Sequence, residues 1–231
     1  MKYSILDKSH DPMGAAISDF YRLGKAARLR VLSSMFEEDE MPVAHLFRSF
    51  GQMAHGRVLD IGAGAGCHAL ALQERDIEVK AIDISPLSCE VMSERGIKDV
   101  ECVNLFDPQL QGKYDTLLLL MNGTGIAGKL ERLPSLLNRL KELLADGGQI
   151  LVDSSDLRYI YENEDGSMDI NLNAPYYGEV DYQMLYKNVK GEPFDWLYTD
   201  PALLASISKQ CGLQCEIVAE GEHYDYLARL M

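Results

Sequence analysis

The chain has 231 residues and carries 36 acidic against 22 basic side chains, so its formal net charge is −14 at pH 7. Its length fits one α/β domain, and 47% hydrophobic with 25% charged residues is an ordinary globular composition. The negative charge disfavours nucleic acid as a partner, and no apolar run reaches the roughly 18 residues of a membrane helix.

The five cysteines predict a reduced protein rather than a disulfide framework. Their number is odd and none forms a C-x-x-C pair. The first residues also lack the apolar segment of a secretory signal, so we expect a cytoplasmic location. The cysteines are Cys67, Cys89, Cys102, Cys211 and Cys215.

The N-terminal region, residues 1–50, is expected to form a helical cap. Apolar side chains recur at steps of three and four over residues 14–36, which predicts a helix that Gly24 weakens or splits in two. An acidic run follows, and Pro42 is expected to begin a short helix toward Phe50.

Residues 51–154 alternate strictly between predicted strands and helices. Strands that are apolar throughout and separated by helices indicate a parallel sheet covered on both faces, that is, a doubly wound α/β fold. Ser85 and Pro86 have the residue types of a helix N-cap and first turn. Strands are expected at 58–61, 78–83, 100–103, 114–121 and 149–153, and helices at 68–75, 86–95 and 130–144.

Residues 155–198 interrupt this alternation and are expected to form an antiparallel β insertion. One strand pair, 157–163 and 168–172, flanks the turn signal Asp165-Gly166, and a second pair is expected at 178–186 and 193–198. In residues 199–231, a helix over 201–210 and strands at 215–219 and 224–230 would complete a mostly parallel seven-stranded sheet. We therefore expect a single domain over residues 1–231.

The strongest functional signal is the loop that follows the first strand of the core. Asp60-Ile61-Gly62-Ala63-Gly64-Ala65-Gly66 leaves a strand and begins a helix, and its glycines allow tight turns and close approach of a ligand. Asp83 ends the next strand, 21 residues after Gly62, where a carboxylate can accept hydrogen bonds from ribose hydroxyls. Together they predict a nucleoside ligand.

Two nucleoside-binding patterns compete for this loop. The dinucleotide pattern G-x-G-x-x-G would place Cys67 at its third glycine, whereas an acidic residue followed by alternate glycines fits without exception. The carboxylate of Asp60 would repel a pyrophosphate but tolerates the positively charged S-adenosylmethionine. Asp60 therefore favours S-adenosylmethionine, and NAD remains the alternative ligand.

With these motifs, residues 57 to about 153 resemble the class I S-adenosylmethionine-dependent methyltransferases. The resemblance implies a Rossmann-like fold, S-adenosylmethionine as cofactor, Asp83 on the ribose and Ile84 against the adenine. It places Asn104 and Leu105 near the adenine amino group. Asn122 ends the fourth-strand motif and is a candidate to line the cofactor near its methionine part, with a role in the turn alone as the alternative. The implied cofactor-binding residues are Asp60, Gly62, Ala63, Gly64, Gly66, Asp83, Ile84, Asn104, Leu105 and Asn122.

The sequence says less about the methyl acceptor than about the cofactor. Residues 122–128 lack the Asn/Asp-Pro-Pro-aromatic motif of DNA-base and amide methylases, which favours a small-molecule acceptor. Tyr21, Tyr176 and Tyr177 are candidates to enclose it, with core packing as the alternative role for the tyrosines of the insertion. Basic residues beside Tyr21 would suit an anionic acceptor or form a solvated face. The histidines show no metal-site spacing, so no metal is expected, and no catalytic base stands out.

The sequence thus predicts methyl transfer from S-adenosylmethionine to an oxygen, nitrogen or carbon atom of a small molecule. A peptide or protein acceptor is the second interpretation. An NAD-dependent oxidoreductase and a non-catalytic nucleoside-binding module remain as further alternatives.

Overall fold

A computed structural model describes residues 4–33, 39–41, 53–163, 165, 167, 173–221 and 224–231. The helices are α1 Pro12–Leu23, α2 Cys67–Gln73, α3 Pro86–Glu94, α4 Leu133–Leu143 and α5 Pro201–Gln210, with short 3-10 helices η1 Lys8–His10, η3 Gly123–Ala127, η4 Leu130–Arg132 and η5 Leu157–Ile160. The strands are β1 Leu29–Leu32, β2 Asp39–Met41, β3 Val58–Ile61, β4 Val79–Asp83, β5 Asp99–Cys102, β6 Tyr114–Leu119, β7 Leu144–Ser155, β8 Glu179–Tyr186, β9 Val189–Lys190, β10 Phe194–Leu197, β11 Cys215–Glu220 and β12 Asp225–Leu230.

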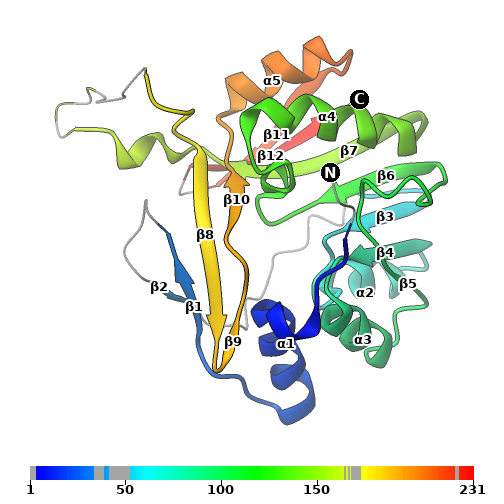
Figure 1. Cartoon of the computed structure of the whole chain (residues 1–231). Helices are drawn as coiled ribbons and strands as arrows, with labels where there is room; N and C mark the ends of the chain where they lie inside the picture. Colours follow the sequence, from blue (N-terminus) through cyan, green and yellow to red (C-terminus); the bar gives the residue numbers. More distant parts are fainter. Residues whose placement is uncertain are drawn as a thin grey trace.

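Seven strands form the main sheet, in the order β11-β12-β7-β6-β3-β4-β5 (Figure 1). The pairs among β7, β6, β3, β4 and β5 are parallel, and β12 runs antiparallel to both β7 and β11. The predicted doubly wound, mostly parallel seven-stranded sheet is therefore confirmed. Strand order reverses at β3, which puts a ligand crevice at the carboxyl ends of β3 and its neighbours.

Helices cover both faces of this sheet (Figure 1). On one face α4 and α5 bury leucines such as Leu136, Leu140 and Leu204, and on the other α2 and α3 bury Leu72 and Met92. Each such side chain contributes about 1.5–3 kcal/mol by leaving water. The two apolar layers hold the strand ends, and thus the crevice, in a fixed position.

The predicted helix signals are largely confirmed. The Ser85 hydroxyl accepts a hydrogen bond from the Ser88 N–H, and Pro86 is the first residue of α3. The helix α5 covers the predicted residues. In contrast, α4 ends at Leu143 because β7 begins at Leu144, so this strand is longer than predicted.

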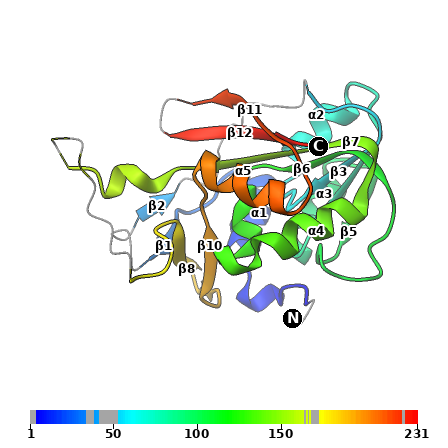
Figure 2. The ribbon, with the colours of Figure 1, turned by 90° about the horizontal axis from the view of Figure 1, so that it is seen from above.

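A second sheet of the order β10-β8-β1-β2 stands at one end of the main sheet (Figure 2). The prediction of a helix over 14–36 is wrong after Leu23, because Gly24 takes a left-handed conformation (φ 70°) that ends α1. Residues 29–32 then form β1, which pairs with β8. The N-terminal cap is thus only partly helical, and the helix predicted from Pro42 lies outside the described residues.

The insertion contains the predicted antiparallel pair β8 and β10. The strand predicted over 157–163 is wrong, because the Asp156 carboxylate accepts the N–H of Arg158 and caps η5 instead. The strand predicted at 168–172 lies outside the described residues. Since β8 also pairs with β1, the insertion and the N-terminal segment form one sheet. No described helix is long and apolar enough to cross a membrane.

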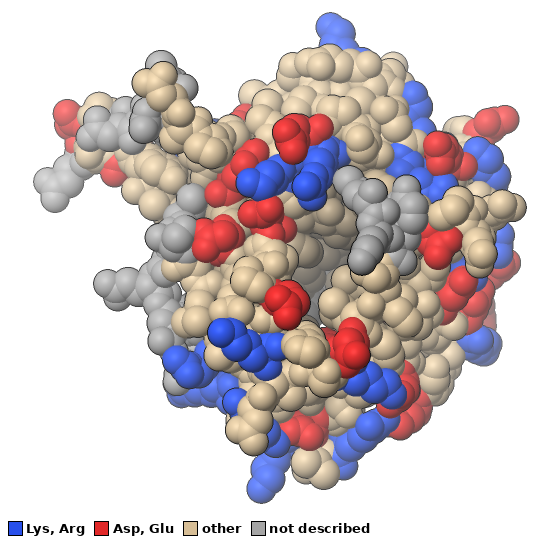
Figure 3. All heavy atoms as spheres, in the orientation of Figure 1, with Lys and Arg blue, Asp and Glu red and all other residues tan. Residues whose placement is uncertain are grey.

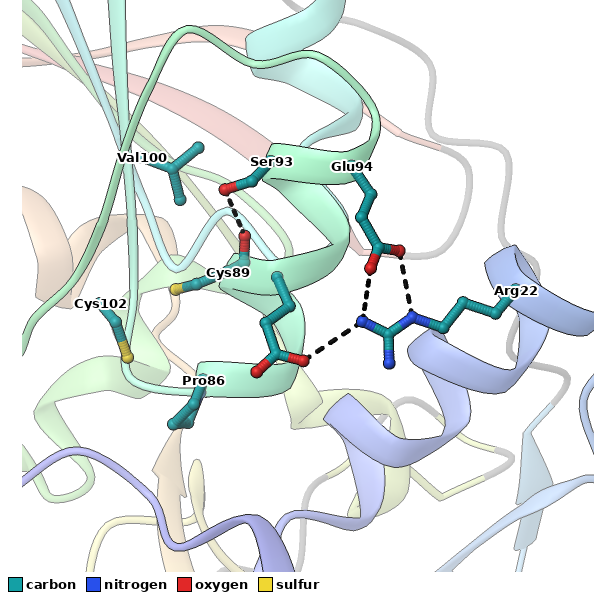
Figure 4. A pocket seen from close by; sticks show the side chains of 8 residues that line it. Arg22, Pro86, Cys89, Ser93, Glu94, Val100 and Cys102 are labelled. Carbon is teal, nitrogen blue, oxygen red and sulfur yellow. Dashed lines mark hydrogen bonds and ion pairs between the residues drawn. The ribbon is translucent and has the colours of Figure 1, made fainter.

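The N-terminal segment is docked at the carboxyl end of β4. The Leu6 N–H donates to the Ile84 carbonyl at 2.7 Å, and the buried Asp11 carboxylate accepts a hydrogen bond from the Ser85 hydroxyl. Arg22 of α1 also bonds Glu94 of α3 (Figure 4). Exposed ion pairs contribute little, so the buried Asp11 contact is the main anchor. The shallow depression of about 540 Å³ seen in Figure 4 is lined by none of the predicted cofactor residues.

Candidate functional site

The loop from Asp60 to Gly66, called the glycine loop below, lies over the carboxyl end of β4. The N–H groups of Gly62 and Ala63 both donate to the Ile82 carbonyl, at 2.9 and 3.1 Å. Gly62, Gly64 and Gly66 have φ values of 70°, 55° and 74°, in the left-handed region that glycine adopts without a Cβ penalty. The glycine spacing seen in the sequence is therefore a backbone requirement of this turn.

Asp83 is held in position by the same loop. Its two carboxylate oxygens accept hydrogen bonds from the N–H groups of Gly64 and Ser85, each at 2.8 Å. Burial raises the pKa of this carboxyl, while these hydrogen bonds act in the opposite direction. Because a carboxylate oxygen has a second lone pair, Asp83 can still accept bonds from a ligand.

Asp60 lies beneath the loop and is 2% exposed. Burial raises the pKa of its carboxyl to about 7, and the negative charge of Asp83 adds to this effect. The Ala69 N–H donates to the carboxylate, whereas Oδ2 has no hydrogen-bond partner among the described residues. Asp60 is thus a buried acid that is partly protonated near neutral pH.

The loop after β6 is backbone-strained. Met121 and Asn122 both have positive φ, 75° and 57°, which costs of order 1–3 kcal/mol per residue. The carboxylate of Asp153 compensates by accepting the N–H groups of both residues and that of Gly123. The Asn122 Oδ1 accepts a hydrogen bond from the Ser155 hydroxyl at 2.9 Å. Side chains at the ends of β6 and β7 therefore fix this loop.

Strand β10 clamps the same loop from the other side. The Trp196 ring lies against the backbone of Gly125, where a Cβ would overlap it, and the Thr124 hydroxyl donates to the Leu197 carbonyl at 2.9 Å. The Ile126 side chain comes within 4.0 Å of the place where a Cβ on Gly62 would lie. The second sheet thus positions a loop that also borders the glycine loop.

Replacing Gly125 with Ala is expected to destabilise the protein by about 2–3 kcal/mol, since the new methyl group must displace the Trp196 ring. Urea unfolding measures this difference. Gly24→Ala is the matched control, because open space surrounds Gly24 and only its positive φ makes the substitution unfavourable, by about 1 kcal/mol. Equal losses of stability in the two variants would contradict a close contact between Trp196 and Gly125.

The other predicted residues differ in where the structure places them. Ile84 is 36% exposed, as a surface for a ligand requires. The Tyr21 hydroxyl lies 3.8 Å from the Cys67 sulfur at the start of α2, and the Arg95 guanidinium lies over the Tyr21 ring. Asn104 closes its own turn by accepting the Phe106 N–H, whereas the Leu105 side chain packs in the main core and is not presented to the crevice.

Tyr176 and Tyr177 form a separate hydroxyl cluster. The Tyr176 hydroxyl donates to Asp200 at 2.8 Å, and that of Tyr177 donates to Asp156 at 2.9 Å. The Tyr176 ring also packs against the main core. Their contact with an acceptor remains a prediction, and their bonds to the two aspartates fix the start of α5 and of η5.

Comparison with solved structures decides the family. The chain is 54% identical to an S-adenosylmethionine-dependent methyltransferase from Bacteroides fragilis, solved with S-adenosyl-L-homocysteine. The match covers 100% of this chain and 98% of that one, with a TM-score of 0.93. This chain belongs to the S-adenosylmethionine-dependent methyltransferases. That membership decides against an NAD-dependent oxidoreductase.

Other relatives of this methyltransferase are more distant. An uncharacterized methyltransferase of Staphylococcus carnosus (strain TM300) is 24% identical over 179 residues, which cover 78% of this chain and 80% of the relative. The CcbJ methyltransferase of Streptomyces caelestis shares the fold, with a TM-score of 0.57 at 14% identity over 96% of this chain and 89% of its own. No family model matches the chain.

Two contacts that position the loop after β6 were not predicted from the sequence of this methyltransferase. Asp153 organises the loop after β6, and Trp196 packs on it from the second sheet. An acidic residue at the end of a predicted strand was a usable signal for Asp153. The contact of Trp196 with Gly125 had no such local signal, because it depends on the pairing of distant segments.

Proposed function

We propose that this methyltransferase binds S-adenosylmethionine across the carboxyl ends of β3, β4 and β6 and methylates a small-molecule acceptor. The observation that carries the proposal is the Asp83 carboxylate, which two backbone N–H groups orient while lone pairs remain for ribose hydroxyls. The S-adenosyl-L-homocysteine complex of the Bacteroides fragilis relative supports the choice of nucleoside.

The remaining predicted residues fit the parts of that cofactor. The exposed Ile84 side chain would contact the adenine, and the loop from Asp60 to Gly66 would border the methionine part together with Asn122. The cofactor supplies an electrophilic methyl group on a positively charged sulfur. The protein then has to align an acceptor and exclude water, which can contribute about 7–11 kcal/mol to catalysis.

A small acceptor is favoured because the second sheet, α1 and the loop after β6 surround the crevice. Figure 3 shows a hollow on this face, between the second sheet and the main sheet. A folded protein acceptor would need an exposed surface at this place.

Methyl transfer is tested with S-adenosylmethionine carrying a deuterated methyl group and a set of small amines, alcohols, thiols and carboxylates. We expect the mass of one class to increase by the labelled methyl group, with equimolar S-adenosylhomocysteine formed. Binding of the cofactor without transfer to any small molecule, together with labelling of a peptide, would contradict the small-molecule assignment.

A further inference from the structure

The turn that carries Asp83 is held by the N-terminal segment as well as by the glycine loop. The Leu6 N–H donates to the Ile84 carbonyl at 2.7 Å, and the Asp11 carboxylate accepts a hydrogen bond from the Ser85 hydroxyl. The two residues that directly follow the proposed ribose ligand are therefore both bound by the start of the chain.

The contact between Asp11 and Ser85 joins the beginnings of two helices, α1 and α3, which lie side by side (Figure 1). Asp11 precedes α1, and its Oδ1 accepts the Gly14 N–H at 2.8 Å. Ser85 precedes α3, and its hydroxyl accepts the Ser88 N–H at 3.0 Å. Because this hydroxyl accepts from Ser88 while it donates to Asp11, its orientation is fixed.

Both side chains of this contact are buried, with Asp11 1% and Ser85 5% exposed. A buried carboxylate needs hydrogen-bond donors or positive charge in place of water, and the N-terminal ends of α1 and α3 supply them. A Cβ on Gly14 would overlap both the Asp11 carboxylate and the Ser85 hydroxyl. The two helices therefore approach each other closely only because residue 14 has no side chain.

Asp11 is itself held in place, because α1 is also anchored to the second sheet. Ala16 of α1 packs with Leu29 and Tyr186. The Tyr186 hydroxyl donates to the Asp19 carboxylate at 2.8 Å. The second sheet thus fixes α1, and α1 fixes the position of Asp11 relative to Ser85.

Ser85 connects this position to the proposed ribose ligand. Its N–H donates to Oδ1 of Asp83 at 2.8 Å, while the Gly64 N–H donates to Oδ2 at 2.8 Å. Hydrogen bonds weaken steeply when donor and acceptor lose alignment. A displacement of Ser85 would therefore turn the Asp83 carboxylate and weaken its bonds to ribose hydroxyls.

We propose that Asp11 is a positioning residue for the cofactor: through Ser85, it holds the Asp83 carboxylate in the orientation that binds the ribose hydroxyls. This role rests on the cofactor site proposed above and adds a residue of the N-terminal segment to it. Asp11 acts through Ser85 and not by contact with the cofactor, since its buried carboxylate is bonded to Gly14 and Ser85.

An effect of the Asp11 charge alone would have the opposite sign. Burial raises the pKa of the Asp83 carboxyl, and the negative charge of Asp11 raises it further. Removing that charge favours the ionised form of Asp83, which is the stronger hydrogen-bond acceptor. Charge alone thus predicts tighter ribose binding when Asp11 is neutralised, whereas positioning predicts weaker binding.

Two ligands separate the ribose bonds from the rest of the cofactor, S-adenosylhomocysteine and its 2′-deoxyribose analogue. We expect calorimetry to show that the wild-type protein prefers S-adenosylhomocysteine by about 10–100-fold, the range for one hydrogen bond to a charged group. Partial unfolding lowers the apparent affinity for both ligands by the same factor. The ratio of the two affinities is therefore unaffected by a loss of stability alone.

Asp11→Asn keeps the oxygen that caps α1 but replaces the acceptor of the Ser85 hydroxyl with an NH₂ group. Gly14→Ala pushes these two side chains apart without changing a charge. We expect each variant to reduce the preference about fivefold, as for the loss of one hydrogen bond. Asp7→Asn is the matched control, because it makes the same chemical change at an exposed site in the same segment and should leave the preference unchanged.

An unchanged or increased preference in either folded variant would overturn the positioning role and leave the proposed cofactor site intact. A wild-type protein that binds the two ligands equally well would instead contradict the proposed ribose contact of Asp83, and the role of Asp11 with it. Urea unfolding of each variant establishes that the protein titrated is folded.

Discussion

Asp83→Ala is expected to weaken S-adenosylhomocysteine binding by about 10²–10³-fold, because hydrogen bonds to a charged group contribute about 1.5–3 kcal/mol each. The carboxylate has two roles in this expectation. It would accept the ribose hydroxyls, and it holds the N–H groups of Gly64 and Ser85 at 2.8 Å, so its loss also loosens the glycine loop. Isothermal titration calorimetry measures the affinity.

Two further variants sharpen this test. Asp83→Asn keeps the size of the side chain but directs an NH₂ group at one of the two backbone donors, so we expect a loss nearly as large. Asp99→Ala is the matched control, since Asp99 lies at the start of the neighbouring strand β5, opposite the carboxyl ends. A loss below about threefold for Asp83→Ala would exclude Asp83 as a ribose ligand.

Asp60→Asn is expected to change how the stability of the protein depends on pH. The pKa of Asp60 is raised from 3.8 to about 7 by burial and by Asp83. Between these two values the folded state holds a proton that the unfolded state has lost, so the free energy of unfolding decreases as pH rises. The contribution of Asp60 to the free energy of unfolding is fully present below pH 3.8 and is lost as pH rises through about 7.

The asparagine variant has no such proton to lose. The wild-type protein should therefore lose stability relative to Asp60→Asn by on the order of 3–4 kcal/mol between about pH 4 and pH 8. Urea unfolding of both proteins over this range gives the difference, in which the shared contributions of Asp83 and His68 largely cancel. A difference that does not vary with pH would contradict a buried protonated Asp60.

Asp7→Asn is a control for which the opposite pH dependence of stability is expected. Asp7 is exposed, and hydrogen bonds from the Ser9 hydroxyl and N–H lower its pKa. Its contribution to stability is therefore present above its unfolded pKa and is lost as pH falls through the lower folded value. The pH effect of this substitution should have the opposite sign and be confined to acidic pH.

The strand and helix order of residues 58–153 was predictable because each element carries its own local pattern. Apolar runs mark β3, β4 and β6, and Ser85-Pro86 marks the start of α3. The second sheet was not predictable in the same way. Residues 29–32 fit both a helical and an extended pattern, and the partner that makes them a strand, β8, lies about 150 residues further along the chain.

The candidate site likewise has one part that could be predicted from the sequence and one part that could not. Asp60, the glycines and Asp83 belong to two consecutive strand-to-helix turns, so their convergence follows from a parallel sheet alone. The contact of Trp196 with Gly125 instead depends on the register between β8 and β10, two strands of the second sheet. Likewise, the interpretation of Tyr176 and Tyr177 as an acceptor lid could not anticipate their hydroxyl bonds to Asp200 and Asp156.

A crystal structure of this protein with S-adenosylhomocysteine tests the central claim most directly. We predict the ribose hydroxyls within hydrogen-bonding distance of the Asp83 carboxylate, with the adenine against Ile84 and the homocysteine beside the loop that begins at Asp60. A nucleoside bound elsewhere, with the Asp83 carboxylate still contacted only by Gly64 and Ser85, would contradict the account.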